Sequence, residues 1–169
     1  SLIAGGSLIQ PGDHVLVTAY SWSSSATAIM HHNAIPVFVD IDFDTINMDP
    51  DKIEAAITPR TKAIVVVHLH GLAVDMDKVM AIARKHNLKV IEDAAQAIGS
   101  TWKGKPIGSF GDFVSFSFQA NKNITTSEGG CLVLNNAEEV ALAEKYRLQG
   151  VTRSGWDGIE VDVLGGKYN

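Results

Sequence analysis

The stretch Lys62-Ala-Ile-Val-Val-Val-His68 decides the fold class, because every residue between its two ends is apolar. A strand with one solvated face would alternate polar and apolar side chains. A parallel strand that is covered on both faces carries a continuous apolar run instead. We therefore predict a central strand of a sheet that has helices packed on both of its faces.

Strand-like and helix-like segments alternate along the rest of the chain. This alternation is typical of a mostly parallel sheet, and we predict a three-layer α/β/α fold. The other expected strands are His14–Thr18, Pro36–Asp40, Lys89–Glu92, Phe113–Phe118 and Cys131–Leu134. The expected helices are Ser23–His32, one capped by Asp49, one opened by Asp75, and Ala137–Gln149. From Gly150 to Asn169 no periodicity is clear, and we expect a glycine-rich loop.

Composition narrows the possible classes of function. The 169 residues are 46% hydrophobic, which is typical of a well-packed domain rather than a disordered segment. A net charge of -5 gives no general attraction for nucleic acid or anionic membranes, so a phosphate ligand would need local donors. The single cysteine, Cys131, permits no disulfide within the chain, and we expect a buried thiol. Since the sequence shows no signal peptide or long apolar span, we expect a cytoplasmic protein.

Lys122 has an unusual sequence context. No other charged residue lies within five positions of it, and the run that contains it follows a predicted strand. A surface lysine usually has charged neighbours that favour its hydration. An amine without them can act as a nucleophile toward a carbonyl group. Lys122 is therefore a candidate for covalent bonding to a carbonyl compound, and the alternative is an ordinary lysine in an exposed loop.

Asp93 follows another apolar strand, in the run Val90-Ile-Glu-Asp-Ala-Ala-Gln-Ala97. In parallel sheets, ligands bind beyond the carboxyl ends of the strands, so Asp93 and Lys122 can converge on one site. A lysine that forms a Schiff base, together with a carboxylate that holds a ring nitrogen, is the arrangement of a pyridoxal phosphate enzyme. The alternative for Asp93 is the cap of a helix that starts at Ala94.

Five motifs extend this interpretation to a family. They are Asp40-Ile-Asp-Phe-Asp-Thr45, Ile57-Thr-Pro-Arg-Thr-Lys-Ala63, Val67-His-Leu-His-Gly71, Ile91-Glu-Asp-Ala-Ala-Gln96 and Ser117-Phe-Gln-Ala-Asn-Lys122. Their order and content resemble the DegT/DnrJ/EryC1/StrS aminotransferases, which are sugar aminotransferases of fold type I. The resemblance runs from about Pro11 to Asn169. It implies a pyridoxal phosphate cofactor, and amino transfer from glutamate or glutamine to a keto sugar, which would be nucleotide-linked.

The resemblance also implies roles for particular residues. Lys122 matches the lysine that bonds to the cofactor and moves a proton, and Asp93 matches the acid that pairs with the pyridine nitrogen. The remaining cofactor contacts implied by the family are Gln96 at the ring hydroxyl, Ser117 at the phosphate, Trp22 stacked on the ring, and Asn169 reaching the phosphate of a neighbouring subunit. The last of these implies a homodimer with shared sites.

The chain also departs from the family pattern. By this resemblance we expect residues 1–169 to form a partial large domain, without the upstream phosphate-binding turn and without the C-terminal small domain. Gln119 stands where many members have histidine or tyrosine. A glutamine at this position is similar to the cyclitol aminotransferases. A keto-inositol aminotransferase is therefore one alternative. A non-catalytic relative and a nucleotide-binding α/β module are two other hypotheses. A related dehydratase would carry histidine at the position of Lys122.

Two further patterns favour structure over function. Gly99-Ser-Thr-Trp-Lys-Gly-Lys105 resembles a phosphate-binding loop, but Pro106 replaces the hydroxyl residue that binds magnesium, so we expect a polar hairpin. The pairs His31-His32 and His68 with His70 lack a cysteine or carboxylate cluster that would complete a metal site. We therefore expect structural or solvated histidines.

Overall fold

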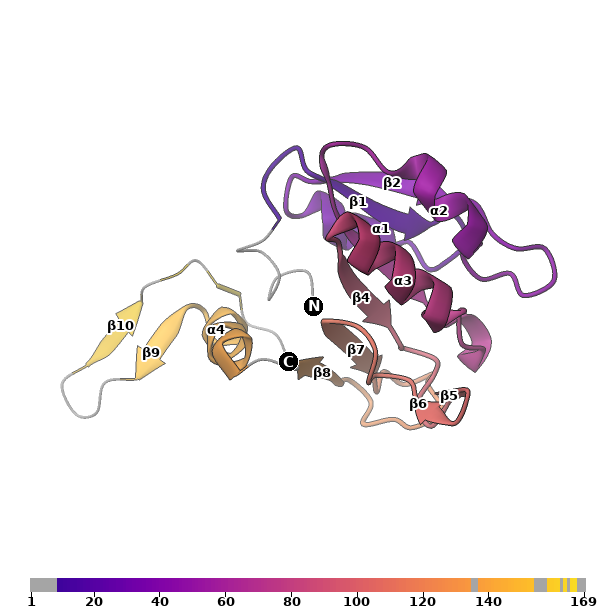
Figure 1. The fold of residues 1–169 in the computed structure, drawn as a ribbon. Helices are drawn as coiled ribbons and strands as arrows, with labels where there is room; N and C mark the ends of the chain where they lie inside the picture. Colours follow the sequence, from indigo (N-terminus) through magenta and orange to yellow (C-terminus); the bar gives the residue numbers. More distant parts are fainter. Residues whose placement is uncertain (1–8, 135–136, 154–157, 162, 164, 167–169) are drawn as a thin grey trace.

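The computed structural model describes residues 9–134, 137–153, 158–161, 163, 165 and 166, and its centre is a six-stranded sheet (Figure 1). The strand order is β2-β1-β3-β4-β7-β8. All neighbouring pairs are parallel except β7 and β8, which are antiparallel. The strands of the sheet are β1 (His14–Thr18), β2 (Ile35–Val39), β3 (Thr61–Val67), β4 (Lys89–Asp93), β7 (Phe113–Ser117) and β8 (Gly130–Leu134).

Helices cover both faces of the sheet. They are α1 (Ser24–Met30), α2 (Pro50–Ala56), α3 (Met76–His86) and α4 (Ala137–Arg147). One buried cluster joins α2 and α3 to the sheet through Ile53 and Val79, and the other joins α1 through Ile29. Successive residues of β3 alternate between the clusters, since Ile64 belongs to the first and Val65 to the second. The predicted three-layer fold with a mostly parallel sheet is therefore confirmed.

Local signals in the sequence explain where α2 and α3 begin and end. The carboxylate of Asp49 accepts the N–H of Asp51, and proline occupies the first position of α2. The carboxylate of Asp75 accepts the N–H of Lys78 at the start of α3. Asn87 ends α3 in the left-handed conformation, a position that asparagine tolerates better than most residues.

Glu92 is a fully buried carboxylate on the α3 face of β4. Its Oε2 lies 3.0 Å from Nε2 of His68, which is also fully buried. Nδ1 of His68 accepts the N–H of Val74, so Nε2 carries the hydrogen and donates it to Glu92. The N–H groups of Phe110 and Gly111 donate to Oε1 of Glu92. These contacts tie β4 to the end of β3 and to the turn before β7.

Replacing Glu92 should reveal an acid-sensitive contribution to stability. Burial alone would raise the pKa of Glu92, but hydrogen bonds from His68 and the Gly111 N–H outweigh it and hold the pKa below its usual range. The ionised group therefore stabilises the fold above the ordinary carboxyl range, and this contribution is lost as pH falls through the lowered pKa. We expect Glu92→Gln to reduce the free energy of unfolding by about 2 kcal/mol at neutral pH. Urea unfolding at a series of pH values measures the effect.

Glu54→Gln is the matched control, because Glu54 carries the same group in an exposed ion pair with Lys85. Exposed pairs contribute little, so this variant should resemble the wild type throughout. The difference between the wild type and Glu92→Gln should shrink on acidification. A penalty that stays constant from neutral to acidic pH would contradict the role given to the ionised carboxylate.

The structure corrects two expectations and supports others. The predicted polar hairpin is confirmed as the antiparallel pair β5 (Thr101–Trp102) and β6 (Lys105–Pro106). The buried position predicted for Cys131 is wrong, since the residue is exposed near the start of the edge strand β8. The prediction of a loop from Gly150 to Asn169 is also wrong, because β9 (Val151–Arg153) and β10 (Ile159–Val161) form an antiparallel pair.

The described residues include no helix that is long and apolar enough to cross a membrane.

Candidate active site

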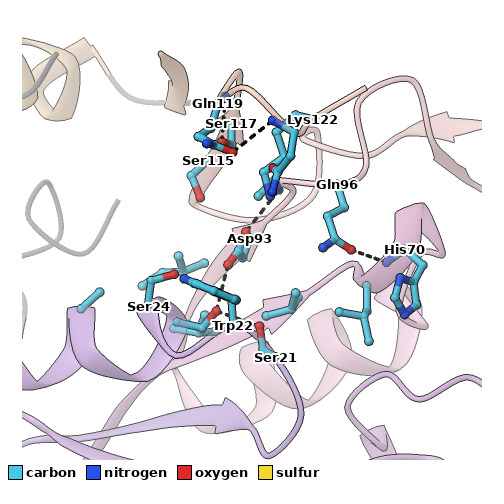
Figure 2. A pocket seen from close by; sticks show the side chains of 18 of the residues that line it. Ser21, Trp22, Ser24, His70, Asp93, Gln96, Ser115, Ser117, Gln119 and Lys122 are labelled. Atoms are coloured by element: carbon cyan, nitrogen blue, oxygen red, sulfur yellow. Dashed lines mark hydrogen bonds between the residues drawn. The ribbon is translucent and has the colours of Figure 1, made fainter. Parts of the chain in front are cut away.

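A cavity of about 910 Å³ opens at the carboxyl ends of β3, β4 and β7, on the face of the sheet that α1 covers (Figure 2). This volume lies within the range of sites that bind small organic molecules. Val65, Val67 and Ile91 contribute apolar surface from β3 and β4. The polar side chains around it come from strand ends and loops, which is where parallel sheets bind ligands.

Asp93 is the last residue of β4 and is held by two hydrogen bonds. Its Oδ2 accepts the hydroxyl of Ser25 at 3.0 Å, and its Oδ1 accepts the N–H of Ala95 at 3.2 Å. No helix starts at Ala94, so the helix-cap alternative does not describe Asp93. Because β4 lies between β3 and β7, strand pairing on both sides fixes the backbone of Asp93.

Lys122 lies in the loop after β7 and lines the same cavity as Asp93 (Figure 2). Its backbone N–H donates to the carbonyl of Gln119 at 2.9 Å, which closes a turn just beyond the strand. Its side chain is half-buried. Among the residues that the structure describes, no carboxylate lies within ion-pair distance of its amine. The amine is therefore available to a ligand in the cavity.

Two amide or hydroxyl side chains that the sequence singled out also line the cavity. Gln96 accepts the backbone N–H of His70 through Oε1 at 2.6 Å, so its NH₂ group remains to donate to a ligand. Ser117 is the last residue of β7, and its hydroxyl accepts the N–H of Gln119 at 3.3 Å. The same hydroxyl can still donate its hydrogen to another acceptor, such as a phosphate oxygen.

Trp22 lies in the loop before α1, at the edge of the cavity (Figure 2). Trp22 is 80% exposed, so it is not an ordinary aromatic residue of the core. An exposed indole beside a cavity offers a flat apolar surface that a planar ligand can cover. Asn169, the remaining predicted contact, lies outside the described residues.

Ser25, Ser115 and His70 also line the cavity, although the sequence did not point to them as site residues. Ser115 could have been found, because it lies two positions before Ser117 on the same strand and so shares its face. His70 lies in the motif Val67–Gly71 and has a left-handed backbone conformation with φ 55°. Ser25 gave no separate signal, since it is one of three consecutive serines at the start of a predicted helix.

The fold and the site together define a class. A carboxylate fixed at one strand end, a lysine after the neighbouring strand and an exposed tryptophan surround one cavity. This is the large-domain architecture of the fold type I enzymes. The chain belongs to the DegT/DnrJ/EryC1/StrS aminotransferase family, whose sequence model matches residues 2–169.

The curated relatives carry different functional names. The chain is 49% identical over 152 residues to the spore coat polysaccharide biosynthesis protein SpsC of Bacillus subtilis, covering 88% of this chain and 38% of that protein. It is 49% identical over 151 residues to the GDP-perosamine synthase of Caulobacter vibrioides, covering 89% and 40%. It is 47% identical over 139 residues to the L-glutamine:2-deoxy-scyllo-inosose aminotransferase of Streptoalloteichus tenebrarius, covering 82% and 33%. The chain thus spans less than half the length of these relatives.

Solved structures share the same fold. The aminotransferase PseC of Helicobacter pylori, which is involved in pseudaminic acid biosynthesis, matches with a TM-score of 0.92 and 30% identity over 99% of this chain and 46% of PseC. NtdA of Bacillus subtilis, with the cofactor PMP bound, matches with a TM-score of 0.88 and 35% identity over 98% of this chain and 37% of NtdA.

Proposed function

We propose that this protein is a pyridoxal phosphate-dependent aminotransferase that transfers an amino group from glutamate or glutamine to the keto carbon of a nucleotide-linked sugar. One observation carries the proposal: the amine of Lys122, which forms no ion pair with the described residues, and the oriented carboxylate of Asp93 line one cavity. The cavity has room for a planar cofactor and a substrate, and the relatives include an aminotransferase named for a UDP-linked sugar.

The residues around the cavity fit the parts of this cofactor. When bound, pyridoxal phosphate would supply a carbonyl carbon and an electron-withdrawing ring. Asp93 would accept a hydrogen bond from the protonated ring nitrogen. Lys122 would hold the cofactor covalently at rest and, once released, remove the proton from the α-carbon of the amino donor.

The other predicted contacts would fix the cofactor in place. Gln96 would donate its NH₂ group to the ring oxygen, because its carbonyl oxygen is occupied by the N–H of His70. Ser117 would donate its hydroxyl to the phosphate. Trp22 would cover one face of the ring and exclude water from it. A negative net charge leaves phosphate binding to such local donors.

A keto-cyclitol is the second candidate acceptor. Gln119 lines the cavity at the position where the family varies, and a cyclitol aminotransferase is among the relatives. An uncharged amide beside the acceptor can donate and accept hydrogen bonds to the hydroxyl groups of either a sugar or a cyclitol. The choice between them therefore depends on how the rest of the acceptor is bound.

We further propose that residues 1–169 form part of the cofactor-binding large domain of a cytoplasmic homodimer. The family resemblance supports shared sites, to which Asn169 would contribute from a neighbouring subunit. This arrangement would also supply phosphate contacts that the described cavity does not contain by itself.

Incubation with pyridoxal phosphate and glutamine or glutamate tests the function. The protein should convert keto acceptors to amino products, which mass spectrometry detects, when offered a panel of nucleotide-linked keto sugars and keto-cyclitols. Amination of a cyclitol alone would favour the second candidate. Protein that gains no cofactor absorbance and aminates nothing would contradict the proposal and favour a non-catalytic relative.

A further inference from the structure

A chain of two serine hydroxyls ends on Asp93. Oγ of Ser25 lies 3.0 Å from Oδ2 of Asp93, and Oγ of Ser21 lies 3.0 Å from Oγ of Ser25. Ser25 is only 6% exposed, in the first turn of α1, and is 68 positions away from Asp93 in the sequence. A buried hydroxyl that reaches across the fold to one carboxylate has a specific partner rather than a solvent contact.

The hydrogen bonds in this chain run in one direction. An ionised carboxylate can only accept, so the single hydroxyl hydrogen of Ser25 goes to Asp93. The contact between the two serines must then be donated by Ser21, because Ser25 has no second hydrogen to give. Successive hydrogen bonds of this kind polarise one another, which strengthens the bond that reaches Asp93.

Each oxygen of Asp93 accepts one hydrogen bond from the residues that the structure describes. The Ser25 hydroxyl binds Oδ2, and the Ala95 N–H binds Oδ1. Two donors on different oxygens resist rotation of the carboxylate about its bond to the chain. The lone pairs that remain are held in a fixed direction, so a ligand that donates to Asp93 meets a preorganised acceptor.

Ser25 also contacts the loop that carries the exposed tryptophan. Its backbone N–H donates to the carbonyl of Trp22 at 3.1 Å. The same residue thus holds the carboxylate through its side chain and the aromatic loop through its backbone. A small shift of the first turn of α1 would move both groups with respect to the cavity.

We infer that Ser25 is a positioning residue that acts on the bound cofactor through Asp93, with Ser21 supporting it. The inference rests on the proposed function, because it assumes a ligand with a ring nitrogen that donates to Asp93. Ser25 itself does not contact the reacting atoms. Its removal would leave Asp93 with one donor and free to rotate, which weakens only the contacts that Asp93 makes.

Two ligands separate this role from a general structural one. Pyridoxamine phosphate binds without a covalent bond to Lys122, and its 1-deaza analogue carries CH in place of the ring nitrogen. Dissociation constants for both are measured by titration of the purified wild type and variants, followed by intrinsic fluorescence. Ser25→Ala should raise the dissociation constant of pyridoxamine phosphate about 10-fold, which is the effect of losing one hydrogen bond to a charged group. The dissociation constant of the analogue should be nearly unchanged. Ser25→Thr keeps the hydroxyl and should restore binding.

Ser23→Ala is the matched control, because Ser23 precedes the same helix and its side chain makes no capping hydrogen bond. This variant should bind both ligands as the wild type does, and thermal unfolding checks that each variant is folded. Equal weakening of both ligands by Ser25→Ala, or no weakening, would overturn the inference while the proposed function stands. A wild type that binds neither ligand would overturn both.

Discussion

Replacing Lys122 with alanine should lower the rate of amino transfer by about 10⁴-fold, because the amine both holds the cofactor and moves the proton. The fold should be unaffected, since the side chain is half-buried and its amine contacts no carboxylate within the described ranges. Initial rates with a saturating amino donor measure the loss, and thermal unfolding verifies the fold.

Two controls make this result specific to Lys122. Lys105→Ala removes another lysine, one that is exposed and lies outside the cavity, and should leave the rate unchanged. Methylamine added to Lys122→Ala should restore part of the activity, because a small amine can enter the space left by the side chain. Substantial turnover by the unsupplemented variant would remove Lys122 from the proposed role.

Asp93→Asn should lower kcat by about 100-fold or more while the cofactor still binds, because an amide cannot stabilise the proton on the ring nitrogen. The change is nearly isosteric. The hydroxyl of Ser25 can rotate to accept from the new NH₂ group, so the variant should fold. Steady-state rates and cofactor titration measure the two effects separately.

Asp44→Asn is the comparison variant, since Asp44 is an exposed residue outside the cavity. It should match the wild type in both rate and cofactor affinity. A near-normal kcat for Asp93→Asn would contradict the assignment of Asp93 to the ring nitrogen. Loss of cofactor binding without loss of kcat at saturation would give Asp93 a role in affinity alone.

Most of the fold could be predicted because its signals are local. The apolar run in β3, the proline and aspartate at the start of α2 and the alternation of segments each depend on neighbouring residues. The convergence of Asp93 and Lys122 followed from one topological rule, since both lie just after strands that point the same way.

The hydrogen bonds of Asp93 and of its neighbour Glu92 could not be predicted from local sequence patterns. Ser25 reaches Asp93 only because β1, which precedes α1, lies beside β3, and β3 lies beside β4. The pairing of His68 with Glu92 likewise depends on the register of β3 and β4. Strand order and register depend on residues that are far apart in the sequence, so a short segment cannot predict them.

The errors have physical causes as well. Cys131 begins an apolar run that resembles a central strand. Among the described strands, however, β8 pairs only with β7, and its first residues are exposed. The strands β9 and β10 have three residues each, which is too short for a period of two to stand out.

The covalent bond between Lys122 and the cofactor is the central claim, and trapping it tests the claim most directly. The purified protein is incubated with pyridoxal phosphate, reduced with borohydride and digested, and its peptides are sequenced by mass spectrometry. We predict that the phosphopyridoxyl group is found on Lys122. A label on another lysine, or protein that remains unlabelled at saturating cofactor, would contradict the account.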